Sequence, residues 1–259
     1  MKALKQEKAG RPAWLPSLLC FVPLVLTVCV GVAVSIALFA ISRRSEWRKM
    51  RAHFESQAQE HTLAVERTME TKILFLESIR TFYEGSQEVE PEEFRTFVGP
   101  SLARLKGVQA IEWAPRVADA QRETCERSAR EAGIAGFQIT ERDAGGSLVR
   151  AAHRAEHFPV RLVEPREGNQ TRYGFDLASD EGCRAALASA RDTGEMAAAS
   201  PVALTEQGRP QAVVSIFVPV YRKGAPTDSA AARHESIEGV IAGIFHLDEV
   251  VEHAFSFLE

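Results

Sequence analysis

The chain has 259 residues, of which 45% are apolar and 25% are charged, a composition typical of a folded globular protein and not of a disordered one. Charge is unevenly distributed, because residues 1–52 carry a net charge of +7 and residues 53–259 a net charge of −11. Contact with nucleic-acid phosphates requires a basic face, so this acidic body counts against a nucleic-acid-binding protein.

The first predicted element is a membrane-spanning helix. No charged residue occurs between Pro12 and Ser42, and the 27 residues of 16–42 would form a helix of about 40 Å, against roughly 30 Å for a bilayer core. Trp14 and Trp47 flank this stretch, as interfacial anchors do. We therefore predict a transmembrane helix over residues 16–42.

A cleavable signal peptide is the alternative for this segment. The head is basic and Ser35–Ala37 resembles a small-x-small cleavage site, but the apolar run exceeds the roughly 7–15 residues of a signal-peptide core. The predicted organisation thus begins with a basic tail over residues 1–15. Basic residues flank the helix on both sides, so charge alone leaves its orientation open.

A long stalk helix is predicted over residues 43–84, which contain no Gly or Pro, with its end at Gly85-Ser86. One face carries an imperfect seam with spacings of three or four residues, typical of a dimer stalk. Its members are Trp47, Met50, Phe54, Gln57, His61, Val65 and Thr68. The alternative is packing on the helix's own domain, which an apolar group favours at the distal end: Ile73, Leu76, Ile79, Phe82 and Tyr83.

The body after residue 85 mixes helices and strands without regular βαβ alternation, which predicts an α+β fold with mostly antiparallel strands. Helices are expected from Pro91 towards Leu105, from an N-cap at Asp119 to Ala132, from an N-cap at Ser179 to Thr193-Gly194, and over Leu247–Phe257. Strands are expected over Val108–Trp113, Phe137–Glu141, Ser147–Ala151, Phe158–Val163, Gln211–Tyr221 and Ile237–His246.

One string has a catalytic appearance. His153, Glu156 and His157 match the H-x-x-E-H pattern of inverted zinc metallopeptidases, which requires both histidines on one helix face. Pro159 follows at once and prevents the helix, so a polar loop before a strand is the favoured interpretation. No other motif indicates catalysis, and we expect no enzyme activity in this chain and no cofactor or metal.

The cysteines leave the redox compartment open. Cys20 and Cys29 fall in the apolar segment, and Cys125 and Cys183 are the only pair in the body. A disulfide between these two and a pair of free buried thiols are both compatible with the sequence.

A set of short strings, in order along the chain, resembles the CHASE domain, the extracytoplasmic sensory domain of histidine kinases and nucleotide cyclases, best known from plant cytokinin receptors. The strings are Ile111–Val117, Arg122-Glu123, Phe158–Val160, Gly174–Leu177, Ala190–Gly194, Pro201-Val202 and Pro219–Tyr221. The resemblance covers about residues 85–255. It implies two PAS-like modules after the stalk, a membrane-distal ligand-binding one over 85–205 and a membrane-proximal one over 206–259.

The resemblance also implies a ligand site. Asp176 matches an aspartate that anchors the ligand's purine ring in the cytokinin receptors, and Ala198 matches a strand position that contacts the ligand through its backbone. Phe158, Thr193 and Val218 complete the expected ligand-binding set. The alternative for Asp176 is a local cap or turn residue. Ala197–Ala199 departs from the family pattern, where larger side chains are usual, and this implies a different ligand.

By resemblance, the chain is expected to be the input half of a histidine kinase, cyclase or phosphodiesterase in the plasma or inner membrane, with Met1 inside and residues 43–259 outside. Since it ends at Glu259, where a second membrane helix normally begins, we expect a fragment. The expected partners are a small molecule, with purine-like compounds among the candidates, the membrane, and a second copy through the stalk. The alternatives are a ligand-free dimerisation module and a tethered zinc hydrolase.

Overall fold

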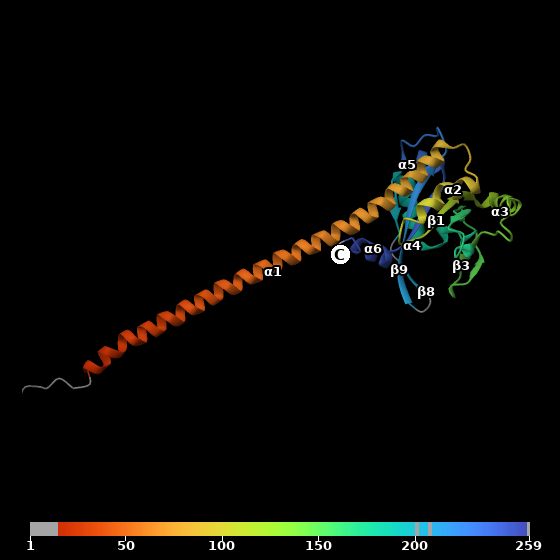
Figure 1. Ribbon diagram of the computed structural model, residues 1–259. Helices are drawn as coiled ribbons and strands as arrows, with labels where there is room; N and C mark the ends of the chain where they lie inside the picture. The colour runs from red at the N-terminus through yellow and green to blue at the C-terminus, as the bar shows by residue number, and fades with distance from the viewer. Residues whose placement is uncertain (1–14, 200–201, 207–208, 258–259) are drawn as a thin grey trace, which may run out of the picture. The chain divides into compact units, whose positions relative to one another are not determined.

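The computed structural model describes residues 15–199, 202–206 and 209–257 (Figure 1). The chain divides into two compact units, Met1–Glu60 and His61–Glu259. Helix α1, Leu15–Gly85, contains 71 residues and runs through both predicted helical segments without a break. Its end at Gly85 is the predicted one, whereas the basic tail before residue 15 lies outside the described residues.

In the first unit, Pro23–Arg44 of α1 is long and apolar enough to cross a membrane, a property that an anchor shares with an N-terminal signal sequence. None of this span is buried within the structure. Further along α1, the seam residues Trp47, Met50 and Phe54 are 61%, 60% and 71% exposed. Large apolar side chains at this exposure leave an unpartnered face on the helix.

The second unit is built on one sheet with the strand order β6-β1-β10-β9-β7, and β8 also pairs with β9. Every pairing in it is antiparallel. Its strands are β1 (Val108–Pro115), β6 (Leu162–Glu164), β7 (Ala197–Ala198), β8 (Val202–Glu206), β9 (Arg209–Tyr221) and β10 (Ile237–His246). The α+β class with antiparallel strands is thus confirmed.

The sheet combines strands from both predicted modules, residues 85–205 and 206–259. Strands β9 and β10 belong to the second predicted module, yet β10 pairs with β1 from the first over Val108–Pro115. The reason lies in β10 itself, which is buried at nine of its ten positions and is therefore covered on both faces. A strand that is buried on both faces lies in the centre of a sheet. As a central strand, β10 pairs with β1 from residues 85–205 and with β9 from residues 206–259.

Helices cover both faces of the sheet (Figure 1). One face packs against the distal end of α1, α2 (Pro91–Leu102) and α6 (Leu247–Phe255). Leu76 and Ile79 of α1 lie in this core with Val218 of β9, so the distal stalk packs on its own domain as predicted. The other face packs against α4 (Glu181–Thr193), where Leu187 and Ala190 contact a core that includes Phe217.

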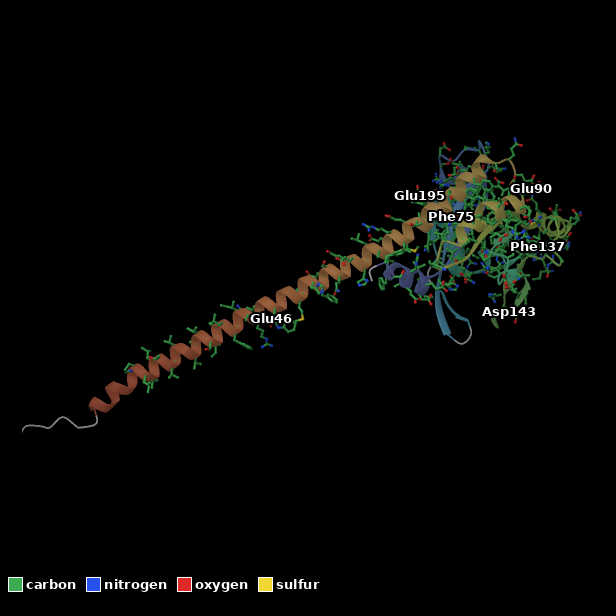
Figure 2. All side chains as sticks on the ribbon, in the orientation of Figure 1. Glu46, Phe75, Glu90, Phe137, Asp143 and Glu195 are labelled. Atoms are coloured by element: carbon green, nitrogen blue, oxygen red, sulfur yellow. The ribbon has the colours of Figure 1, made fainter. Side chains whose placement is uncertain are left out.

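A smaller third core lies beside the sheet. Helix α3 (Arg122–Glu131), the hairpin β3 (Thr140–Arg142) with β4 (Leu148–Arg150), and the pair β2 (Val117–Ala118) with β5 (Glu156–His157) surround it. Asp143 at the hairpin tip (Figure 2) accepts hydrogen bonds from the backbone N–H of Gly145 and Ser147. The predicted hairpin around Gly145-Gly146 is thus confirmed. The remaining elements are η1 (Asp119–Gln121), η2 (Gln170–Arg172), η3 (Leu177–Ser179) and α5 (Ala230–Ser236).

Several predicted details are wrong. Asp119 is not an N-cap: α3 begins after Gln121, and the Asp119 carboxylate binds two histidines instead. The N-cap of α4 is Asp180, not Ser179, because its carboxylate accepts the backbone N–H of Cys183. The expected strand over 158–163 is formed only from Leu162 onward. For Cys125 and Cys183 the sequence left two states open, and the structure has both as free thiols.

Candidate functional site

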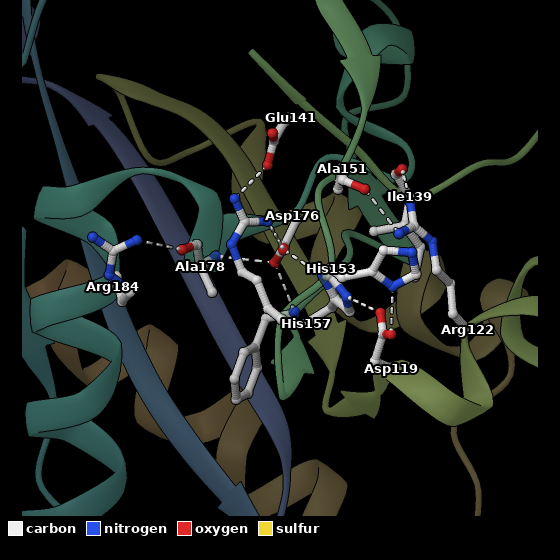
Figure 3. A network of polar contacts seen from close by, with 12 residues as sticks. Asp119, Arg122, Ile139, Glu141, Ala151, His153, His157, Asp176, Ala178 and Arg184 are labelled. Atoms are coloured by element: carbon white, nitrogen blue, oxygen red, sulfur yellow. Dashed lines mark hydrogen bonds and ion pairs between the residues drawn. The ribbon is translucent and has the colours of Figure 1, made fainter. Parts of the chain in front are cut away.

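A buried polar network surrounds Asp176, which is 0% exposed (Figure 3). One carboxylate oxygen accepts the backbone N–H of Phe158 at 2.8 Å and of Ala178 at 3.1 Å. The other accepts Nδ1 of His157 at 2.7 Å and Nη1 of Arg154 at 3.3 Å. A carboxylate offers roughly four acceptor positions, so these four donors saturate it.

Local geometry fixes Asp176 in this place. Gly174, two residues earlier, has φ +79°, and a Cβ there would lie 2.0 Å from the carbonyl oxygen of Gln138. Only glycine allows this close approach, after which the N–H of Asp176 donates to Thr140 at 2.8 Å. The Asp176 carboxylate then caps η3 through Ala178. The segment 174–178 is thus held in place by contacts within the protein itself.

Two histidines extend the network towards the surface. His157 is fully buried and its Nε2 lies 3.0 Å from Asp119, whose second oxygen lies 2.7 Å from Nδ1 of His153. The hydrogen bond to Asp176, together with that to Asp119, raises the pKa of His157 despite its burial. The two histidines lower the pKa of Asp119 to about 2. The arrangement favours a protonated His157 that donates to two carboxylates.

The residues of the H-x-x-E-H string do not have the geometry of the alternative zinc site. Glu156 and His157 form a two-residue strand, not a helix, and the Glu156 carboxylate accepts Nε of Arg116 at 2.6 Å and Nη1 of Arg191 at 2.8 Å. Among the residues that the structure describes, no group of three His, Cys, Asp or Glu side chains could hold a metal ion. The three residues of the string therefore do not meet at one point, as a zinc hydrolase requires.

A cavity of about 200 Å³, here called the arginine pocket, adjoins the network. Its lining comprises Arg154, Ala155, Glu156, Phe158, Ala178, Arg184, Leu187, Ala188 and Arg191. The last four residues repeat at helical spacing on one face of α4. Asp176 lies behind the wall and holds three of the lining residues, Arg154, Phe158 and Ala178.

The three arginines of the pocket differ in their partners. Arg154 is paired with Glu141 and Asp176, and Arg191 with Glu156 and Asp192. Arg184 has only a 3.5 Å contact from Nη1 to the carbonyl oxygen of Ala178, and no carboxylate partner in the described part of the chain. Its guanidinium is therefore the cation in this lining that is free to pair with an anionic group.

The five expected ligand residues do not all come together. Phe158 borders the arginine pocket and Asp176 lies directly behind it, but Thr193, Ala198 and Val218 do not line it. Thr193 ends α4 and donates to Ser189, and Ala198 is exposed on β7. Val218 is buried on the opposite face of the sheet, against the α1 side, because successive residues of a strand alternate between faces.

Sequence reasoning missed the arginines of the pocket. The spacing of Arg184, Leu187, Ala188 and Arg191 was visible as one helix face. That this face and the segment 154–158 border the same cavity becomes apparent only in the folded structure, where both pack on the sheet.

Comparison with known proteins adds three findings. The sequence model of the CHASE domain matches residues 87–258. Hybrid signal transduction histidine kinase A of Dictyostelium discoideum is 24% identical over 251 residues, which cover 93% of this chain and 11% of the kinase. The ligand-binding domain of the Pseudomonas aeruginosa PAO1 amino acid chemoreceptor PctC, solved in complex with GABA, is 12% identical with a TM-score of 0.38, over 76% of this chain and 62% of that one.

Proposed function

We propose that this chain, which belongs to the CHASE domain family, is the small-ligand-sensing input region of a membrane-bound signalling receptor. The observation that carries the proposal is the family match, since residues 87–258 take in the sheet, the buried network and the arginine pocket. A histidine kinase is the output that the Dictyostelium relative supports. This chain spans only 11% of that kinase, so the output domain belongs to the proposal.

The proposed ligand site is the arginine pocket. At about 200 Å³ it is smaller than the roughly 300–1,000 Å³ of drug-sized sites, which suits a small metabolite. Phe158 and Leu187 offer apolar contact, and Arg184 offers an unpaired guanidinium. We therefore infer a small ligand with an anionic group that meets Arg184. In this proposal Asp176 holds the lining residues Arg154, Phe158 and Ala178 in position. It does not contact the ligand directly, in contrast to what the resemblance to the cytokinin receptors implied.

Replacing Arg184 tests this site. In full-length protein, Arg184→Ala removes the free cation and should weaken binding of an anionic ligand found by screening about tenfold to a hundredfold, as measured by calorimetric titration. Arg184→Lys keeps the charge and should recover part of the affinity. Arg184 is exposed and makes no ion pair, so the melting temperature should not change.

A matched control is Arg127→Ala, another exposed arginine on a different helix, α3. Its ligand affinity should equal that of the wild type. If screening yields only neutral or purine-like ligands whose affinity is the same for the wild type and Arg184→Ala, the arginine pocket is not the sensor site.

The proposed orientation places the second unit outside the cytoplasm, with Pro23–Arg44 as the anchor and α1 as the stalk of a parallel homodimer. The exposed seam residues Trp47, Met50 and Phe54 support the dimer, because an apolar helix face of this kind is typically covered by a second helix. Within the second unit, Phe255 of α6 packs edge-to-face on His61 of α1 at 4.5 Å. Helix α6 therefore contacts the stalk directly and offers a path for a signal.

One substitution tests orientation and dimer together. A cysteine at Phe54 should be labelled in intact cells by a membrane-impermeant thiol reagent and should cross-link to its counterpart in membranes. The parent for this test carries no other reactive cysteine. Phe54→Cys is to be compared with cysteines at neighbouring positions, and cross-linking should repeat every three or four residues. Uniform absence of cross-links along the stalk excludes the dimer, and absence of labelling excludes the orientation.

A further inference from the structure

A second cavity lies on the other side of the sheet from the arginine pocket, beside the distal end of α1. Its volume is about 830 Å³, within the usual range of small-molecule sites. We call it the Tyr83 cavity. The end of α1 and the segment up to Pro91, the end of β1, and the Tyr221–Lys223 segment contribute to its lining, along with Arg161 and Glu238.

Two lining residues carry buried polar atoms without a partner. Oη of Tyr83 and Nη1 of Arg161 are both shielded from solvent and make no hydrogen bond in the structure. The rest of the Arg161 side chain also lacks hydrogen bonds and ion pairs in the described residues, and its guanidinium lies over the ring of Phe137 at 5.7 Å. Buried donors of this kind are rare in folded proteins and call for a specific explanation.

The two residues have Trp113 as a common neighbour. The N–H of Arg161 donates to the carbonyl oxygen of Trp113 at 2.8 Å, and the Trp113 ring stacks on Tyr83 with centroids 4.3 Å apart. Trp113 therefore connects both residues at the end of β1. Burial also lowers the pKa of Arg161, and burial together with the nearby Glu238 carboxylate raises the pKa of Tyr83.

The lining of the cavity contains four acidic and three basic side chains. Glu84 is paired with Arg80, which lies outside the lining. Of the three bases, Arg222 and Lys223 donate to the carbonyl oxygens of Glu235 and Gly85. Arg161 is the base whose guanidinium makes no hydrogen bond or ion pair in the described part of the chain, so its N–H groups are free to pair with an anionic group.

We propose that the Tyr83 cavity binds a small organic carboxylate, whose oxygens accept hydrogen bonds from Nη1 of Arg161 and Oη of Tyr83. The ligand would touch α1 at Tyr83, and the cavity thus joins the sheet to the stalk helix. This site is separate from the arginine pocket and does not depend on the function proposed for that pocket.

Two probes of matched shape and opposite charge test the inference: benzoate and benzamidine. Full-length protein in nanodiscs is titrated with each by calorimetry or ligand-observed NMR, in an Arg184→Ala background so that the arginine pocket does not contribute. Benzoate should bind and benzamidine should not. Arg161→Met should weaken benzoate binding about tenfold or more, and Tyr83→Phe by a smaller factor of about threefold.

Stability separates a ligand site from a structural role. Neither Arg161 nor Tyr83 gives up a hydrogen bond on substitution, so the melting temperature of Arg161→Met and Tyr83→Phe should equal or exceed that of the parent. Arg127→Met, outside the cavity, is the control and should leave both measurements unchanged. The inference is overturned if benzoate does not bind the parent, if neither variant affects its affinity, or if both variants melt markedly earlier than the parent.

Discussion

Asp176→Ala should destabilise the second unit by about 3–5 kcal/mol, the loss typical of removing one partner from a buried charged network. The substitution leaves the N–H groups of Phe158 and Ala178, the ring of His157 and the guanidinium of Arg154 without their shared acceptor. All of these except Arg154 lie in the protein interior, where water cannot replace the carboxylate. Chemical unfolding followed by circular dichroism gives the difference directly.

Asp176→Asn separates the charge from the hydrogen bonds. The amide oxygen can still accept from the backbone of Phe158 and Ala178, so the loss should be smaller than with alanine. A direct ligand anchor predicts a different result, in which Asp176→Ala keeps the wild-type stability and loses only ligand affinity. That outcome would restore the role expected from the cytokinin-receptor resemblance.

The pH dependence of these variants is a second readout. The hydrogen bond to Asp176 raises the pKa of His157 above its ordinary 6.5 in the folded state. The stability that this contributes is fully present below pH 6.5 and is lost as pH rises through the folded-state pKa. Removing the carboxylate should therefore cost most below about pH 6 and progressively less at higher pH. A difference in melting temperature that is constant from pH 5 to pH 9 would exclude a protonated His157 in the network.

The elements that the sequence predicts best are those specified by local pattern. The part of α1 over residues 43–84 follows from a long segment without Gly or Pro, and α2, β1, β9 and β10 follow from apolar spacing and bounding residues. The pairing of β10 with β1 was not predictable, because nothing local to β9 or β10 indicates which strand each will pair with. That choice is made by long-range packing on both faces of the sheet.

The site was predictable to a lesser degree. The resemblance singled out Asp176 and Phe158, which are hydrogen-bonded to each other in the structure. It predicted that the Asp176 carboxylate contacts the ligand. In the structure this carboxylate is buried and its acceptor positions are occupied by protein donors. Several family strings prove to have structural roles of this kind. Gly174 permits a close backbone approach, and Glu112, in the Ile111–Val117 string, lies in the core.

Glu112 and Arg172 form a buried ion pair that connects β1 to η2. Glu112 is 0% exposed, and its two oxygens accept Nε and Nη2 of Arg172 at 2.5 and 2.8 Å, a bidentate geometry. The Arg172 guanidinium also lies over the ring of Phe175 at 5.0 Å. Burial opposes the charge on Arg172, but the adjacent Glu112 outweighs it and raises the pKa of the guanidinium. Arg172 therefore remains charged.

Arg172→Ala should lower the free energy of unfolding by about 3–5 kcal/mol, because it leaves the Glu112 carboxylate buried without a counter-ion. Arg95→Ala is the matched control, since Arg95 forms an exposed pair with Glu92 at 3.7 Å and should lose less than about 1 kcal/mol. The double variant Glu112→Leu with Arg172→Met removes both charges and should recover much of the lost stability. Denaturant unfolding of the four proteins completes the test. If the double variant is as unstable as Arg172→Ala, the pair supplies stability through its specific geometry, and an uncompensated charge on Glu112 is not the cause of the loss.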